Sequence, residues 1–338
     1  MSRVLVTGGS GTIGAAVVRR LLADPAYEVR VSDRRTAPQW MREGCEVHTG
    51  DLRVPREARA AAHDCSHIVH LAALGGGNAG RQRLPHALIE ANNALYNAVI
   101  RAALGIELER FVYVSSAAVF ERAELFPTPE DYLAQCPTPT SAYGFSKLTG
   151  EMYCRAANDE HGLPFTICRA FNAYGPGELP GAAPGIAHVV PDLIDRTLSG
   201  QRPLAIYGSG EQTRTLTHVE DVADGVIAAM SSPAGLNEDF NISAAREVTV
   251  AELARIVWEA CGDDPQAFEL ERLPALAPDI QRRWPSVEKA RRLLDWQAQT
   301  ELEEGISATV SWLRAGTGTR SPTGSGEHHA HAARATRG

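Results

Sequence analysis

Short apolar segments alternate with segments of helical periodicity through the first half of the chain. Apolar runs of this length are typical of parallel strands buried on both faces. Arg3–Thr7 is such a run, and further strands are predicted at Tyr27–Ser32, Glu46–Thr49, His67–Leu71 and Arg110–Ser115. Helical spacing of apolar residues follows in 15–22, 56–62, 87–104 and from Ser141 to about His161. This alternation predicts an α/β fold with a doubly wound parallel sheet of the Rossmann type.

The regular alternation ends after Arg169, which predicts a change of domain. We expect a first domain over residues 1–170, to which a later segment at about 204–231 returns. A smaller interleaved domain is expected over 171–316. Residues 317–338 lack apolar periodicity and are rich in Gly, Thr, Ser and His, so we predict a disordered tail there.

Composition and charge narrow the possible partners. The 338 residues carry a formal net charge of −8, and no basic stripe is present, which argues against a nucleic-acid partner. No apolar run approaches membrane-spanning length, and the first strand begins too early to leave room for a signal peptide. The six cysteines contain no C-x-x-C pair and indicate a reducing compartment. We expect a soluble, cytoplasmic protein with no membrane partner.

A glycine-rich turn follows the first predicted strand and opens the first predicted helix. Small residues at Gly8, Gly11 and Gly14 let the backbone turn sharply and approach a dinucleotide pyrophosphate. Its negative charge is stabilised by free N–H groups at a helix N-terminus. The spacing is G-x-x-G-x-x-G rather than G-x-G-x-x-G, but the flanking strand and helix both agree with the interpretation. We predict a dinucleotide site here, with Thr12 and Ile13 inside the turn.

Carboxylates end the second and third predicted strands. Asp33 lies where an acid would hydrogen-bond the ribose hydroxyls of the adenosine. It favours NAD because it would repel a 2′-phosphate, although the two arginines that follow would tolerate NADP. Asp51, followed by Leu52, could contact the adenine amino group. The alternative for Asp51 is an N-cap of the helix predicted at 56–62.

The fourth predicted strand ends in Ala72 and Ala73, whose small size would let the backbone lie along the cofactor. His63, His67 and His70 are spaced closely enough to suggest a metal site. However, strand alternation sends His67 and His70 to opposite faces, and no acid or thiol accompanies them. We therefore predict no metal.

Tyr143 and Lys147 are four residues apart on a predicted helix, so both side chains project from one face. A free tyrosine titrates at about pH 10, which is too high for a base at neutral pH. An adjacent ammonium and a positively charged nicotinamide ring would both favour the phenolate. Ser116, at the carboxyl end of the fifth strand, lies where open α/β sheets bind ligands and can hold a reacting hydroxyl.

Several motifs occur in one order along the chain. They are Thr7-Gly-Gly-Ser-Gly-Thr-Ile-Gly14, Asp33, Asp51-Leu52, His70-Leu-Ala-Ala73, Val114-Ser-Ser116, Tyr143-x-x-x-Lys147, Arg169-Ala-Phe-Asn-Ala-Tyr-Gly-Pro-Gly177, Tyr207-Gly-Ser-Gly-Glu-Gln-Thr-Arg214 and His218-Val-Glu-Asp-Val222. Over about residues 3–314 the chain resembles the extended short-chain dehydrogenase/reductase family. The resemblance is to its nucleotide-sugar epimerase and dehydratase branch.

The resemblance implies that 1–170 binds NAD and that 171–316 holds a nucleotide sugar. It implies a tyrosine base, a lysine on the nicotinamide ribose and a serine that orients the substrate. The implied cofactor contacts are Gly8, Gly11, Thr12, Ile13, Gly14, Asp33, Asp51, Leu52, Leu71, Ala72, Ala73, Ser115, Tyr143 and Lys147. The implied substrate contacts are Ser116, Asn172, His188 and Arg214. Arg214 would grip the diphosphate, since guanidinium donors suit phosphate oxygens. His188 resembles a proton donor of GDP-sugar epimerase-reductases, or it hydrogen-bonds in the substrate pocket.

One position discriminates between reactions of the branch. Its dehydratases, decarboxylases and 3,5-epimerases typically carry an acid or a cysteine two residues after the serine, where this chain has Ala118. Without that group we expect a 4-epimerase, in which hydride passes transiently to bound NAD and a 4-keto sugar turns over. The alternatives are an NAD(P)-dependent dehydrogenase or 4-keto-reductase, another epimerase or dehydratase of the branch, and a non-enzymatic NAD-binding regulator.

Departures from the family pattern leave the nucleotide open. The second diphosphate arginine would fall near Leu276 and is absent, and Arg272, Arg282 or Arg283 would have to replace it. Gly75-Gly-Gly-Asn78, together with His188, resembles the GDP-sugar subgroup more than the UDP-galactose one. UDP-, GDP- and dTDP-sugars therefore all remain candidates. The helices near 87–104 and 143–161 form the dimer interface in the family, so we expect a homodimer.

Overall fold

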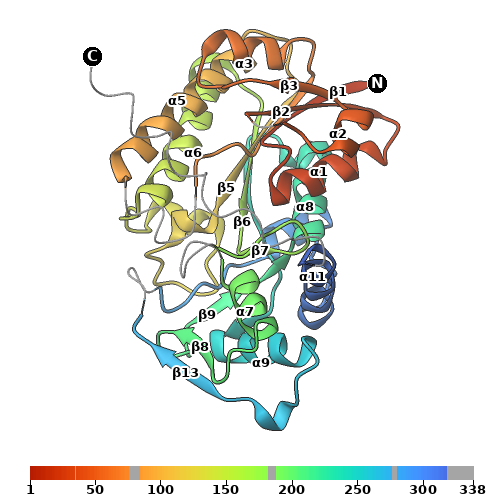
Figure 1. The fold of residues 1–338 in the computed structure, drawn as a ribbon. Helices are drawn as coiled ribbons and strands as arrows, with labels where there is room; N and C mark the ends of the chain where they lie inside the picture. Colours follow the sequence, from red (N-terminus) through yellow and green to blue (C-terminus); the bar gives the residue numbers. More distant parts are fainter. Residues whose placement is uncertain (35, 76–83, 182–187, 276–279, 318–338) are drawn as a thin grey trace, which may run out of the picture.

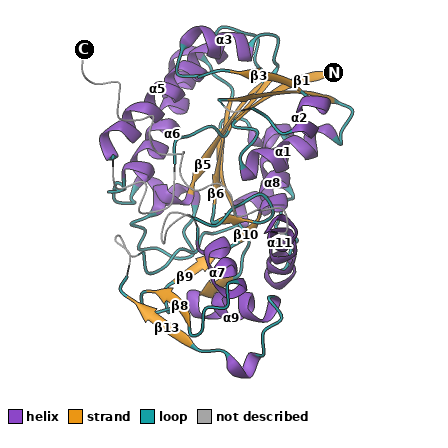
Figure 2. Ribbon diagram, viewed as in Figure 1, coloured by secondary structure: helices purple, strands orange, loops and turns teal. Residues whose placement is uncertain are grey.

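Seven parallel strands form the central sheet of the protein, which we describe from a computed structural model covering residues 1–34, 36–75, 84–181, 188–275 and 280–317 (Figures 1 and 2). The spatial order is β11-β6-β5-β4-β1-β2-β3. These strands are β1 (Ser2–Thr7), β2 (Tyr27–Asp33), β3 (Glu46–Thr49), β4 (His67–His70), β5 (Arg110–Ser116), β6 (Phe165–Ala170) and β11 (Glu238–Ile242). The five predicted strands are confirmed, each end lying within about one residue of its expected place.

Helices cover both faces of the sheet (Figure 1). One face packs against α1 (Thr12–Leu22), α2 (Gln39–Gly44) and α8 (Val219–Ser231), and the other against α3 (Pro55–Ala62), α5 (Pro85–Ala103) and α6 (Ala142–His161). The four central strands β6, β5, β4 and β1 are buried on both sides because their apolar residues enter a separate core cluster on each face. The predicted α/β doubly wound fold is therefore confirmed.

The smaller part of the molecule has its own core, in which Trp258 is 1% exposed. It contains three two-stranded sheets: β7 (Ala173–Tyr174) with β10 (Thr217–His218), β8 (Leu204–Tyr207) with β13 (Leu270–Leu273), and β9 (Thr213–Thr215) with β12 (Glu247–Thr249). Its helices are α7 (Val189–Leu198), α9 (Val250–Ala260) and α11 (Leu302–Thr317). The remaining helices of the chain are α10 (Glu288–Leu294), η1 (Ala117–Phe120), η2 (Glu130–Ala134), η3 (Pro233–Gly235) and η4 (Pro265–Ala267).

The chain passes between its two parts more than once. Of the segment 204–231, expected to return to the first domain, only α8 packs on the central sheet, whereas β8 belongs to the smaller part. The strand that completes the large sheet is β11, which pairs with β6 from Glu238 to Ile242. Sequence alternation missed β11 because its acidic and amide residues break the apolar run. Except for Thr317, the predicted disordered tail lies outside the described residues.

Candidate active site

A cleft of about 1170 Å³ opens at the carboxyl ends of the central strands, between the sheet and the smaller part. Parallel strands in register bring these ends to one edge: Thr7 pairs with Ser32 on one side and His70 on the other. The predicted residues that line it are Gly8, Gly11, Thr12, Ile13, Gly14, Leu71, Ala73, Ser115, Ser116, Tyr143, Lys147, Asn172, His188 and Arg214. Asp33, Asp51, Leu52 and Ala72 lie outside this lining.

The glycine turn leaves the N-terminus of α1 open toward the cleft. Gly8 has a positive φ of 70°, and a Cβ there would come within 3.0 Å of Ala72 Cα. At Gly14 a Cβ would lie 2.3 Å from Gly8 O. Gly11 is the N-cap of α1 without a capping side chain, and the first turn of α1 carries no acid. These free N–H groups and close backbone approaches fit a dinucleotide pyrophosphate.

The carboxylates at the ends of β2 and β3 already have partners. Asp33 accepts a hydrogen bond from Ser10 Oγ. Asp51 accepts from the Arg53 backbone N–H and guanidinium, both at 3.0 Å, and hydrogen bonding to Arg53 lowers the pKa of Asp51. The N-cap alternative for Asp51 is wrong, because α3 begins at Pro55 with Val54 as its N-cap. Leu52 packs into the core beside α3 and α5.

Tyr143 and Lys147 both project from the first two turns of α6 into the cleft. The Lys147 side chain is buried, and its ammonium donates to the Val114 carbonyl at 2.8 Å. The same Nζ lies 6.0 Å from the centre of the Tyr143 ring and 5.1 Å from that of Tyr113. A buried positive charge at this distance stabilises a phenolate more strongly than it would in water.

The two serines at the end of β5 point in different directions. Ser116 lines the cleft, and its Oγ accepts from the Ala118 N–H at 3.2 Å, which caps η1. Ser115 donates its hydroxyl to buried Glu151 at 2.6 Å. Successive residues of a strand face opposite sides, so the Ser115 hydroxyl points into the interior while that of Ser116 faces the cleft. The predicted cofactor contact of Ser115 stays a prediction, since the residue lines the cleft while its hydroxyl hydrogen is used by Glu151.

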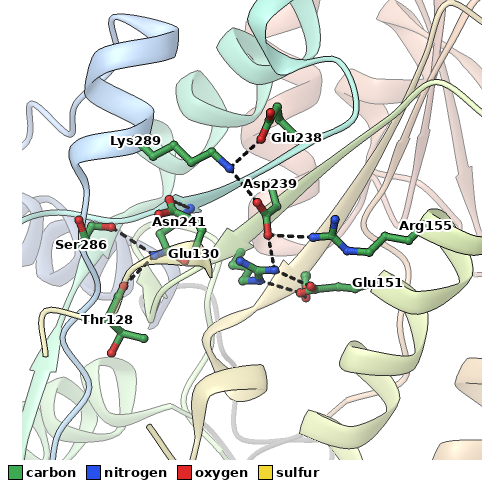
Figure 3. A network of polar contacts seen from close by, with 11 residues as sticks. Thr128, Glu130, Glu151, Arg155, Glu238, Asp239, Asn241, Ser286 and Lys289 are labelled. Carbon is green, nitrogen blue, oxygen red and sulfur yellow. Dashed lines mark hydrogen bonds and ion pairs between the residues drawn. The ribbon is translucent and has the colours of Figure 1, made fainter. Parts of the chain in front are cut away.

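Glu151, one helical turn after Lys147, belongs to a buried charge network behind the cleft (Figure 3). Arg169 donates to Glu151 at 2.9 and 2.6 Å and to Asp239 at 2.6 Å. Lys289 and Arg155 also contact Asp239. Burial would raise the pKa of Asp239, but Arg169 and Lys289 outweigh it and hold that pKa far below its ordinary value. The network fastens α6 to β6 and β11.

Arg214, on β9, and Arg283 both line the cleft. Arg214 donates to the backbone carbonyls of Thr213 and Ile280, and Arg283 donates to Asn172 Oδ1 at 3.3 Å. Both guanidinium groups line the cleft, together with Asn172. Of the three candidates for the missing arginine, only Arg283 does so. Arg272 donates to Ser209 O and Arg282 pairs with Glu247.

His188 lines the cleft in contact with Glu178, and its side chain is 58% exposed. The two histidines of β4, His67 and His70, lie on opposite faces of the sheet, as strand alternation predicts. His70 bonds Thr7 Oγ1 at 2.7 Å in the core under α5, while His67 packs on Tyr27 on the opposite face. In the described part of the chain, no three metal-binding side chains come together.

Residues 4–243 match the sequence profile of a family described as the NAD dependent epimerase/dehydratase family. This chain belongs to that family. The predicted family resemblance is thus confirmed.

Other members of the family resemble the chain over nearly its whole length. UDP-glucose 4-epimerase of Thermotoga maritima, solved with UDP-glucose, is 30% identical with a TM-score of 0.83, over 93% of this chain and 99% of that one. UDP-glucose 4-epimerase of Thermus thermophilus, in complex with NAD, is 28% identical with a TM-score of 0.80, over 92% and 99%. A probable GDP-L-fucose synthase of rice is 29% identical over 92% of this chain and 91% of its own length.

Sequence reasoning missed several residues that shape this family site. Buried Asn92 binds both backbone groups of Leu74 at 2.7 and 3.0 Å and Ser146 Oγ at 3.0 Å, which ties the segment after β4 to α6. Glu151 could have been found, because it repeats the four-residue spacing of Tyr143 and Lys147. The expected features at Gly76–Asn78 and Leu276 lie outside the described residues. Among the described helices, none is long and apolar enough to cross a bilayer.

Proposed function

We propose that this chain is a nucleotide-sugar 4-epimerase that works with tightly bound NAD. The observation that carries the proposal is the set of groups beside Ser116. Tyr143 and buried Lys147 face the cleft, while Ala118 places no titratable group next to them. Such a set can move a hydroxyl proton, but at this position it lacks the acid or base that would remove a proton from carbon. Oxidation and re-reduction at one carbinol is the chemistry it supports.

The turn before α1 fits NAD. Its glycines allow the diphosphate to approach the backbone, and the N–H groups of α1 stabilise its charge. Asp33 would accept from the adenosine ribose hydroxyls and disfavour a 2′-phosphate. Lys147 keeps two N–H donors beyond its bond to Val114 O, and these would hold the nicotinamide ribose. NAD, when bound, supplies an acceptor and then a donor for the hydride on the sugar C4 carbon.

Tyr143 would act as the base and then as the acid. Its phenolate, stabilised by the Lys147 ammonium, takes the proton of the C4 hydroxyl, and the phenol later returns a proton to the same oxygen. Ser116 Oγ still has its hydrogen to donate after accepting from Ala118 N–H, so it can orient that oxygen. Rotation of the keto sugar between the two transfers inverts C4.

The substrate would be held through its diphosphate by Arg214 and Arg283. Guanidinium groups bind phosphate oxygens in a bidentate manner, and two of them at one end of the cleft suit a diphosphate. Asn172 and His188 would contact the sugar nucleotide nearby. The family resemblance extends to proteins named for UDP-, GDP- and dTDP-sugars, so the proposal covers all three.

We also propose a homodimer formed through α5 and α6. Exposed apolar side chains gather on these helices and at their ends: Leu84 is 66% exposed, Met152 47% and Phe145 41%. Phe145 and Met152 are seven residues apart, which places them on one face of α6. Such a face is typical of an interface between copies of a chain. Light scattering of the purified protein would test it, and a monomer at all concentrations would contradict it.

NMR of the purified protein incubated with a panel of UDP-, GDP- and dTDP-sugars tests the activity. We expect one sugar to convert to its C4 epimer without added cofactor and without net change in reduced-nicotinamide absorbance. Steady formation or consumption of reduced cofactor would instead indicate a dehydrogenase or 4-keto-reductase. Tyr143→Phe should lower kcat by about 100-fold or more while NAD remains bound, because it removes the proton-transfer group. Near-normal turnover of that variant would exclude the proposed base.

A further inference from the structure

Glu121, just after η1, lines the cleft and also a smaller cavity of about 260 Å³ beside it. Its carboxylate does not stand free in either space. Oε1 accepts from Thr140 N–H, from Thr140 Oγ1 at 2.9 Å and from Ser141 N–H at 2.8 Å, while Oε2 accepts from Ser141 Oγ. Four donors from one dipeptide therefore converge on a single side chain from a different segment.

That dipeptide is the start of α6. Ser141 is its N-cap, and its Oγ accepts from Gly144 N–H at 3.0 Å. A serine hydroxyl has one hydrogen, and here it goes to Glu121, so the lone pairs are turned toward the helix. Glu121 thereby fixes the orientation of the group that caps the first turn of α6. The Tyr143 residue lies in this turn, two positions after Ser141.

The same turn also packs closely at Gly144. A Cβ at Gly144 would lie 2.6 Å from Ala118 O and 2.9 Å from Pro139 Cβ. The first turn of α6 is thus held against the segment after β5 by the packing at Gly144 and by the hydrogen bonds to Glu121. Ser116 and Ala118 belong to that same segment. The hydrogen bonds of Glu121 therefore fix the position of the first turn of α6, with Tyr143, relative to Ser116.

We propose that Glu121 is a positioning residue, which fixes Tyr143 relative to Ser116 through the cap of α6. This inference rests on the proposed function of Tyr143. Glu121 acts through Thr140 and Ser141, and its acceptor sites are filled by their donors, so it is not an acid or base in the reaction. A misplacement of about 1 Å in a reacting group can cost about 100-fold in rate, which makes such a clamp consequential.

The test compares Glu121→Ala and Glu121→Gln with Glu124→Ala. Glu124 is an exposed carboxylate three residues further, and it serves as the matched control. We expect Glu121→Ala to lower kcat by about tenfold or more, with KM and NAD affinity within about twofold of wild type. Glu121→Gln should keep most of kcat, because its amide oxygen still accepts from the two backbone N–H groups. Glu124→Ala should match wild type.

Amide hydrogen exchange gives a second readout that needs no turnover. In Glu121→Ala we expect faster exchange confined to residues 140–147, with unchanged exchange in 150–161. Should Glu121→Ala fail to fold, Ser141→Ala cuts the same link and should give the same pattern. Unchanged exchange in 140–147, a uniform rise along α6, or kcat equal to that of Glu124→Ala would each overturn the inference. Absence of turnover by the wild type with every sugar tested would refute the proposed function, while the exchange result still decides the role of Glu121 as a clamp.

Discussion

Replacing Arg169 by methionine would remove the cation that joins two buried carboxylates behind the cleft. The side chains of Arg169 and Glu151 are 0% exposed, and that of Asp239 is 12% exposed. At an effective dielectric constant of about 20, unit charges about 4 Å apart attract by about 4 kcal/mol. In the intact network, the free energy lost by desolvating the charges offsets much of this attraction. A variant that loses only the cation still leaves the two carboxylates desolvated, without the attraction of Arg169. We therefore expect Arg169→Met to lower the free energy of unfolding by about 3–5 kcal/mol.

A double-mutant cycle with Glu151→Gln separates this effect from lost packing. Unfolding in urea, followed by tryptophan fluorescence, would give the free energy of each variant. Because the second substitution removes the uncompensated charge, the double variant should be more stable than Arg169→Met alone by about 1–2 kcal/mol. Strict additivity of the two single effects, or a loss below about 1 kcal/mol for Arg169→Met, would refute the reasoning.

Two further predictions concern His70 and Arg283. Burial, with a smaller contribution from Lys147, lowers the pKa of His70 from 6.5 to about 3. The unfolded chain therefore binds a proton that the folded chain does not, and stability should fall by about 2 kcal/mol from pH 6.5 to about 5. His70→Gln should remove this part of the pH dependence of the urea midpoint, and an unchanged slope would contradict it. Arg283→Leu should weaken nucleotide-sugar binding by about tenfold or more in calorimetric titration, since it removes charge-assisted bonds to the diphosphate. Arg272→Leu is the control, and equal losses in both variants would argue against a specific role.

The central sheet could be predicted closely because its strands carry their own signal. A strand buried on both faces is an apolar run bounded by turn residues, and β1 and β5 have that form most clearly, whereas β3 reads Glu46-Val-His-Thr49 and has no buried residue. The smaller sheets lack it. β8 pairs with β13 from far along the chain, and only tertiary packing selects that partner.

The candidate site shows the same division. Gly8, Tyr143 and Ser116 could be placed together because parallel strands bring their carboxyl ends to one edge. The partner of the Ser115 hydroxyl could not, since Glu151 reaches it only through the packing of α6 on β5. The choice of Arg283 over its neighbours likewise depends on how the chain approaches β9, which no local pattern records.

The outermost position of β11 has a consequence for how the chain is made. When β6 leaves the ribosome, strands β1 to β6 of the large sheet have all been synthesised. The strand β11, which pairs with the outer edge of β6, has not. Until Glu238–Ile242 arrives, the nascent protein presents the open edge of β6, with Arg169 still awaiting Asp239. A chain that ends early, before β11, would therefore expose the unpaired edge of β6 and would lack the Asp239 carboxylate that pairs with Arg169. Chaperones and proteases recognise such incompletely folded chains.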